Sequence, residues 1–120
     1  MYAPNKLIGT SIALGAGNSN TTFIVGGMGT PPADGLVYAA TYCYNMVWAG
    51  LTDWYLPSKD ELNKLYLNRA AIGGLGSSSR WSSSEYDARA NGAWIQYSGD
   101  GSQGPALKSV ARAVRAVRSF

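Results

Sequence analysis

The chain has 120 residues, the size of a single domain, and 46% of them are hydrophobic. A domain of this length buries roughly two thirds of its unfolded surface, so it needs neither a metal nor a disulfide to fold. One cysteine and no histidine exclude an intramolecular disulfide, a histidine-ligated metal and any catalytic site with a histidine base. The net charge of +3 is mild, and three of the ten basic residues lie near the C-terminus, where they predict a solvated face rather than a nucleic-acid patch.

The first predicted elements are two strands. Residues 5–14 read as one strand, and residues 21–25 (TTFIV), which are rich in β-branched side chains, read as a second. The turn-forming stretch between them predicts a hairpin with a long loop. The chain starts without a basic region followed by an apolar run, so no signal peptide is predicted, and no apolar stretch reaches membrane-spanning length.

A stripe of apolar residues then predicts a helix. Its members are spaced 3, 4, 3 and 1 positions apart, which is the helical period: Val37, Ala40, Tyr44, Val47 and Trp48. Asp34 is placed to cap this helix and Gly50 to stop it, and a strand is the less favoured alternative. Cys43 lies beside the stripe, and we interpret it as a small core residue because nothing basic in the sequence stabilises a thiolate.

The clearest helix start in the chain follows Pro57, which cannot continue a helix from upstream. Ser58 supplies an N-cap oxygen, and Glu61, three residues on, completes a capping box. One face of this helix carries Leu62, Leu65 and Tyr66, and the glycine-containing stretch at 68–74 ends it. Trp54, just before the helix, is large and apolar, so we expect it in the core.

Beyond residue 73 the chain is rich in Gly, Ser, Asp and Asn. Short strands are predicted at Arg80–Ser83, Ala93–Ser98 and Ala106–Ser109. The last run, residues 110–120, fits two structures. Val110, Val114 and Val117 have a helical period, whereas an imperfect alternation over residues 113–119 fits a strand.

Several sequence motifs follow one another in the second half of the chain. Residues 53–62 (DWYLPSKDEL) match a D-W-x-L-P-[ST]-x-x-E-L signature, and residues 81–85 (WSSSE) match a W-S-S-[ST]-[ET] step. The further motifs are Ala93-Trp94, residues 100–103, Lys108 and residues 114–118. Together they resemble the C-terminal domain of the Legionella collagen-like adhesin and its relatives in bacteria, prophages and phages. The resemblance covers about residues 37–120, and Gly104-Pro105 departs from the acceptor-rich stretch of typical relatives.

This resemblance implies an α+β, C-type-lectin-like fold within one domain, residues 1–120. Residues 1–36 are then an N-terminal hairpin and residues 37–72 hold two helices packed on a small antiparallel sheet. Residues 73–120 form a long loop-rich excursion with a second small sheet and end in a central C-terminal strand at 113–119. The N-terminal strand is expected to pair near that strand and to bring the two ends of the chain together.

Such a fold carries its variable contacts on the excursion, because loops tolerate change when a rigid scaffold fixes their ends. Tyrosine there suits sugar rings and protein surfaces, and charged side chains give directional hydrogen bonds. The candidate ligand contacts are Arg80, Glu85, Tyr86, Asp87, Arg89, Asn91, Tyr97, Asp100, Gln103 and Lys108. For any one of them, the alternative is that it holds its own loop together.

Other residues of the motifs have structural interpretations. Trp81 and Trp94 are expected to pack in the core, and residues 82–84 are read as strand and turn serines because no base activates them. Arg115 and Arg118 are expected to form salt bridges with carboxylates such as those of Asp53, Asp60 or Glu85. The lectin-type calcium motifs are absent, so neither a metal nor a cofactor is expected.

The sequence therefore predicts a non-catalytic recognition module that binds a host-surface polysaccharide or protein. The favoured setting is a phage tail fibre or tail tip in the virion, as a homotrimer in contact with other tail proteins. The alternatives are a structural or decoration protein of the virion, and an extracellular bacterial adhesin domain that binds anionic glycans. Nucleic-acid binding, membrane insertion and enzymatic activity are not expected.

Overall fold

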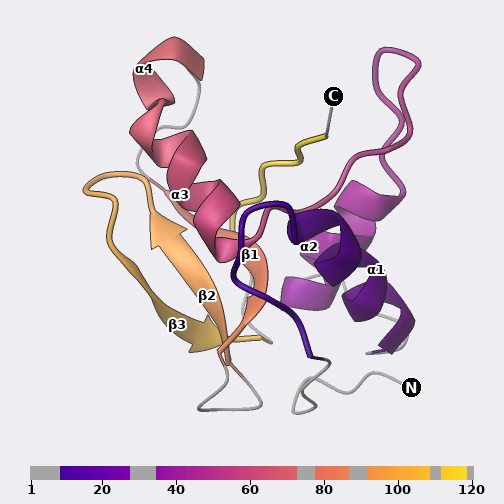
Figure 1. The fold of residues 1–120 in the computed structure, drawn as a ribbon, viewed down its shortest axis with the longest axis horizontal. Helices are drawn as coiled ribbons and strands as arrows, with labels where there is room; N and C mark the ends of the chain where they lie inside the picture. The colour runs from indigo at the N-terminus through magenta and orange to yellow at the C-terminus, as the bar shows by residue number, and fades with distance from the viewer. Residues whose placement is uncertain (1–8, 28–34, 73–77, 87–91, 109–111, 119–120) are drawn as a thin grey trace.

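The computed structural model describes residues 9–27, 35–72, 78–86, 92–108 and 112–118. Within these residues, four helices precede three strands (Figure 1), which confirms the α+β class. The elements are α1 (Gly17–Gly27), α2 (Gly35–Tyr44), α3 (Lys59–Leu67), α4 (Arg69–Ile72), β1 (Ser79–Glu85), β2 (Gly92–Tyr97) and β3 (Gln103–Leu107).

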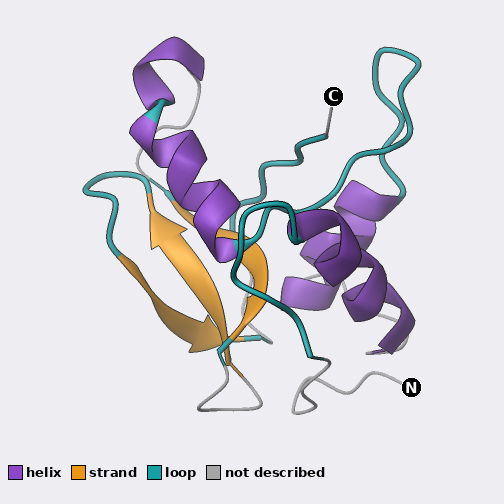
Figure 2. Cartoon of the chain, viewed as in Figure 1, coloured by secondary structure: helices purple, strands orange, loops and turns teal. Residues whose placement is uncertain are grey.

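The three strands form one antiparallel sheet in the order β1-β2-β3, close to the three stretches predicted from the sequence. Trp81 pairs with Ile95 across β1 and β2, and Ile95 pairs with Gly104 across β2 and β3. Helices α1 and α2 pack together beside the β1 edge of the sheet, whereas α3 contacts both β1 and β2 (Figure 2). Helices α1 and α2 therefore flank the β1 edge of the sheet, α3 lies against β1 and β2, and β3 forms the opposite edge.

The core lies between α1, α2 and β1. Its fully buried members are Ile24, Leu36, Ala39, Ala40, Cys43, Leu56, Trp81 and Ala93. Trp81 is in the core as predicted, and Cys43 is a buried core residue as predicted. Burial raises the pKa of the Cys43 thiol to about 12, so the thiol stays protonated at neutral pH. Trp94 and Trp54 are only partly buried, so neither is the core residue that the sequence predicted.

Residues 21–25, predicted as a strand, lie inside α1 instead, and the described residues 9–16 form loop and turn. The helix buries Gly17, Asn20, Thr21 and Ile24, which are spaced 3, 1 and 3 positions apart. The two polar members satisfy the backbone of other segments. Asn20 Oδ1 accepts a hydrogen bond from the Ser11 amide at 2.9 Å, and Thr21 Oγ1 accepts one from the Leu56 amide at 2.9 Å. Packing along this face outweighs the β preference of the side chains.

The start of α1 approaches the chain before α3 very closely, which predicts a specific intolerance. A Cβ at Gly17 would lie 2.9 Å from the Leu56 carbonyl oxygen and against the Glu61 carboxylate. We expect Gly17→Ala to lower the free energy of unfolding by about 1–3 kcal/mol in urea denaturation, because backbone atoms must shift. Gly26→Ala in the same helix is the control, since a Cβ there meets nothing within 4 Å. That variant should be neutral or slightly stabilising, and equal losses in both would contradict the prediction.

Helix α3 has the capping box that its sequence predicts. Ser58 Oγ accepts from the Glu61 amide at 3.3 Å, and Glu61 Oε1 accepts from the Ser58 amide at 2.9 Å. The helix ends at Leu67, and Asn68 caps it before the short α4.

Helix α2 is shorter than the stripe of apolar residues predicted. It ends at Tyr44, and the chain then turns back through Ala49 and Gly50, whose φ angles are +54° and +77°. The amides and carbonyls of Trp48 and Leu51 bond each other across this two-residue turn at 3.0 and 3.1 Å. Two successive positive φ angles are the geometry of a tight hairpin turn, so Gly50 serves this turn and does not stop α2.

The C-terminal segment, residues 112–118, is not the regular central strand that was predicted. It makes two isolated bridges, one parallel between Arg80 and Ala113 and one antiparallel between Tyr55 and Val117. The segment spans from β1 to the chain before α3, so no single neighbour gives it a continuous ladder. Arg118 forms the predicted salt bridge with Asp53, with Nε 2.7 Å from Oδ1.

Candidate functional site

Three of the predicted ligand contacts lie in the interior and are unavailable to a ligand on the surface. Lys108 Nζ donates to Glu85 Oε2 at 2.8 Å, and both side chains are at most 1% exposed. Burial lowers the pKa of Lys108, and the hydrogen bond to Glu85 opposes part of that shift. Arg80 is 9% exposed and donates to Ser98 Oγ at 2.6 Å. These three hold loops and strands together, which was the alternative interpretation.

Four more predicted contacts lie at or near the surface. Tyr97 on β2 is 44% exposed. The ring of Tyr86 packs edge-on against the ring of Trp94, with the two centroids 5.2 Å apart. Asp100 accepts from the amide and hydroxyl of Ser102, and these hydrogen bonds lower its pKa. Gln103 donates to the Lys59 carbonyl at 2.9 Å. The other three predicted contacts, Asp87, Arg89 and Asn91, lie outside the described residues.

A broad hollow opens instead at the C-terminal end of α2, far along the chain from the predicted contacts. We name it the aromatic hollow. It has a volume of about 460 Å³ and is lined by Tyr38, Thr41, Tyr42, Asn45, Met46, Val47 and Trp48. The residues Tyr38, Tyr42 and Trp48 are 43%, 51% and 62% exposed, so three aromatic residues of one hollow are open to the solvent. Contiguous exposed apolar surface of this kind is typical of a binding site.

The chain fixes these rings from two directions. Tyr38 and Tyr42 are four residues apart on α2, which places their rings on one face with centroids 6.4 Å apart. Trp48 is held by the tight turn that follows it and by edge-on packing against Trp54 at 6.0 Å. A ligand would therefore meet side chains that are already ordered, which reduces the entropy cost of binding.

Two neighbouring hollows extend the aromatic hollow into a groove. The first, of about 340 Å³, shares Tyr42, Met46 and Trp48 with it and adds Trp54 and residues 114–116. The second, of about 450 Å³, continues from Trp54 to residues 115–118 and Leu65. We name the whole feature the aromatic groove. It runs from tyrosines at one end to arginines at the other.

The two arginines at one end of the aromatic groove, Arg115 and Arg118, differ in their charged neighbours. Arg118 is bound to the Asp53 carboxylate through two nitrogens, at 2.7 and 3.0 Å. Arg115 lies close enough to Arg80 for its positive charge to add to the effect of burial in lowering the pKa of Arg80. Like charges held together in this way favour an anion nearby.

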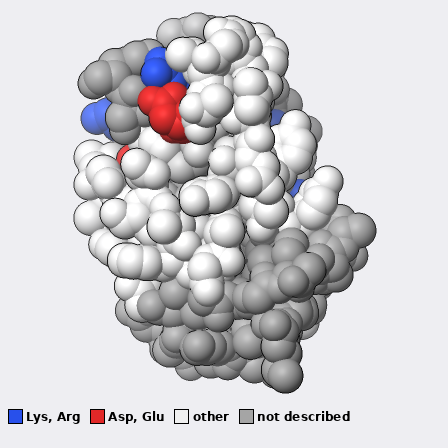
Figure 3. Space-filling view, turned by 90° about the vertical axis from the view of Figure 1, so that its right-hand side faces the viewer, with Lys and Arg blue, Asp and Glu red and all other residues white. Residues whose placement is uncertain are grey.

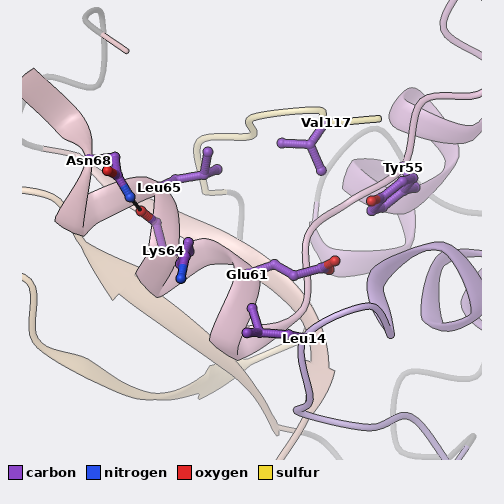
Figure 4. Close-up of a pocket in the computed structure, with 7 residues that line it drawn as sticks. All are labelled: Leu14, Tyr55, Glu61, Lys64, Leu65, Asn68 and Val117. Atoms are coloured by element: carbon purple, nitrogen blue, oxygen red, sulfur yellow. Dashed lines mark hydrogen bonds between the residues drawn. The ribbon is translucent and has the colours of Figure 1, made fainter. Parts of the chain in front are cut away.

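A different hollow, of about 350 Å³, lies between α3, the segment before α1 and the C-terminal segment (Figure 4). It is lined by Leu14, Tyr55, Glu61, Lys64, Leu65, Asn68 and Val117. Its carboxylate, Glu61, points toward Tyr55, and its oxygens accept from the amides of Gly15, Gly17 and Ser58. Because those amides occupy the carboxylate, this hollow has less to offer a ligand than the aromatic groove.

Charge is distributed very unevenly along the chain. Residues 9–27 and 35–52, which contain α1, α2 and the turn after α2, include no Lys, Arg, Asp or Glu. Among the described residues on the face shown in Figure 3, most of the visible surface is accordingly uncharged, and the largest group of charged atoms lies near the top of the view. An uncharged face with exposed rings is costly to leave in water, which supports a role in binding.

The sequence did not lead us to this groove, because Val47 and Trp48 were interpreted only as part of the apolar stripe of a helix, and the other residues of the aromatic hollow carried no prediction. Tyr44, Val47 and Trp48 are 48%, 69% and 62% exposed, although the stripe predicted them to face inward. The available signal was the lack of charge on any side of residues 35–52. A helix that is apolar on its outer face has more apolar surface than one core can cover.

Metal-binding clusters and membrane-spanning helices are both absent from the described residues. Within them, no three side chains of metal-ligating types lie close enough together to hold an ion. No helix in this part of the chain combines the length and the hydropathy needed to cross a bilayer.

Comparison with known proteins gives one family. The model of the Lcl C-terminal domain matches residues 18–118, which confirms the resemblance seen in the motifs. The match starts near the beginning of α1, earlier than the motifs indicated, so α1 is part of the family's domain. None of the curated proteins matches the chain.

Proposed function

The chain belongs to the Lcl C-terminal domain family, and from this premise we propose that it is a non-catalytic recognition module for a glycan or protein on a host surface. The family points to an adhesin-like domain with a surface or extracellular location. The observation that carries the proposal is the aromatic groove, whose tyrosine end groups exposed aromatic side chains in a lining without charge. Aromatic side chains of this kind dominate the energy of many binding surfaces.

The finer parts of the proposal rest on the family resemblance. We propose a C-type-lectin-like fold and a homotrimer, displayed on a phage tail fibre or tail tip. A bacterial adhesin domain and a structural virion protein are the alternative settings. Light scattering at micromolar concentration tests the trimer, and a monomer there would remove it.

A second candidate ligand has its own supporting observation. Arg115 lines the two hollows beyond the aromatic hollow and lies close enough to Arg80 for the two positive charges to interact, which favours an anionic glycan there. Binding of that kind should weaken steeply as salt is raised, because salt screens exposed charges.

Removing the rings of the groove should weaken attachment to host surfaces. We expect Tyr42→Ala and Trp48→Ala each to lower affinity for intact cell envelopes about tenfold, the effect of losing a hot-spot aromatic. Flow cytometry with the labelled domain measures this over a panel of bacterial and animal cells. Tyr97→Ala is the matched control, because Tyr97 is similarly exposed but lies on β2. Loss in the Tyr97 variant with none in the other two would place the binding surface on the sheet.

A further inference from the structure

The aromatic hollow differs from the rest of the groove in its lack of charge. None of its lining residues is charged, and its nearest charged neighbour in the groove, Arg115, lines the next hollow instead. A charged ligand group placed in the aromatic hollow would lose water and gain no opposite charge from the lining. That arrangement is unfavourable, so the lining selects against ions.

The hollow is nevertheless not a purely apolar surface. Thr41 and Asn45 contribute a hydroxyl and an amide to the lining, and Tyr38 and Tyr42 contribute phenol groups. In the described part of the chain, the Asn45 side chain makes no hydrogen bond, although its backbone amide bonds the Thr41 carbonyl at 2.9 Å. Its amide therefore remains available to donate to and accept from a ligand.

Flat rings and neutral hydrogen-bonding groups match one class of ligand. A sugar ring has an apolar C–H face, which packs on an aromatic ring, and a rim of hydroxyls, which bond amides and phenols. An aliphatic protein surface would cover the side-chain amide of Asn45 without giving it a hydrogen-bond partner, which is unfavourable. The volume of about 460 Å³ lies within the range of small-ligand pockets.

We infer that the aromatic hollow is a subsite for an uncharged sugar ring, packed on Tyr42 and Trp48 and hydrogen-bonded by Asn45. The inference rests on the proposed function and names the ligand class of that surface. The two ends of the groove then have different roles. A neutral sugar binds at the tyrosine end, and this assignment does not depend on which ligand binds near Arg115.

The test uses the whole 120-residue chain and an array of neutral hexose and N-acetylhexosamine oligosaccharides, with sulfated and sialylated ones beside them. We expect binding to neutral members, with an affinity that changes less than about twofold when salt is raised from about 0.15 M to about 1 M. Trp48→Ala and Tyr42→Ala should each lower that affinity about tenfold. Tyr42→Phe should retain most of the affinity for neutral sugars. Asn45→Ala should lower that affinity about tenfold, because a sugar hydroxyl loses its hydrogen-bond partner.

The matched controls are Arg115→Gln and Tyr97→Ala, both of which should leave neutral-sugar binding unchanged. Three results would overturn the inference: binding only to anionic sugars, loss of binding with salt, or loss in Arg115→Gln. A Trp48→Ala variant that changes the oligomeric state in light scattering would also overturn it, because the hollow would then be a contact between copies. If cells bind the domain but neutral sugars do not compete, the subsite fails and the recognition function stands. If no cell envelope binds it, the recognition function fails.

Discussion

Lys108→Met is expected to lower the free energy of unfolding by about 3–5 kcal/mol, the cost of leaving one buried charge without its partner. Lys108 and Glu85 meet at 2.8 Å with almost no exposed surface, so no water replaces the lost ammonium group. Methionine fills a similar volume, which separates the effect of charge from that of a cavity. Urea unfolding followed by circular dichroism measures the change. Typical domains have a free energy of unfolding of about 5–15 kcal/mol, so this loss would be a large fraction of the total.

The double variant Glu85→Gln with Lys108→Met tests the same mechanism. It removes both charges, yet glutamine keeps the Oε1 oxygen that accepts from the amides of Gly9 and Thr10. We expect it to be more stable than Lys108→Met alone, because no uncompensated charge remains. If the double variant were the less stable of the two, the buried charge would not be the cause of the loss.

The ion pair between Asp53 and Arg118 is the exposed comparison. The Arg118 side-chain hydrogen bond lowers the pKa of Asp53. A carboxyl with a lowered pKa stabilises the fold above its unfolded pKa, and the contribution is lost as pH falls through the folded pKa. Asp53→Asn should therefore lower the free energy of unfolding only slightly at neutral pH, because solvent screens the pair. Below the folded pKa of Asp53 the substitution should have no effect on that free energy.

Glu61→Ala is expected to cost about 2–3 kcal/mol, because one carboxylate serves three backbone amides in two elements. Its oxygens accept from Ser58 at the start of α3, from Gly17 at the start of α1 and from Gly15 before it, at 2.9 to 3.1 Å. Both helix starts present partial positive charge, which favours a carboxylate between them. Thermal and urea unfolding measure the loss.

Two variants separate this joint role from simple capping. Glu61→Gln keeps one acceptor oxygen, so it should lose roughly half as much as Glu61→Ala. Asp60→Asn is the control in the same turn, since it removes a carboxylate from the first turn of α3 and leaves the three amide contacts in place. A loss in Asp60→Asn as large as in Glu61→Ala would mean that the helix dipole, and not the contacts to Gly15 and Gly17, is responsible.

The sequence predicted correctly where neighbours along the chain supply the interaction. The capping box of α3 joins Ser58 and Glu61 across one helical turn, so the residue types alone indicated the start of the helix. The three strands lie close to their predicted positions for a similar reason, since local composition marks their turns. The family motifs also lie in this part of the chain, and the family match confirms them.

The failures occur where distant segments decide the structure. Residues 21–25 have strand propensity, but α1 forms because Asn20 and Thr21 bond the chain near Ser11 and Leu56. Lys108 and Glu85 looked like surface contacts because charged residues are usually exposed. Their pairing across 23 positions, together with the amides of Gly9 and Thr10 that donate to Glu85, keeps both of them inside.

The α+β class, the start of α3, the approximate places of β1 and β2 and the family could be predicted from the residues alone, because each depends on local hydrogen bonds or on ordered motifs, whereas β3 starts three residues before its predicted range. The tertiary structure alone decided which aromatic side chains face the solvent. Tyr42 and Trp48 are large aromatic residues of a kind common in cores, but the core between α1, α2 and β1 is built from other side chains, and these two residues are 51% and 62% exposed. Burial is a property of how elements share space, and no periodicity within one element specifies it.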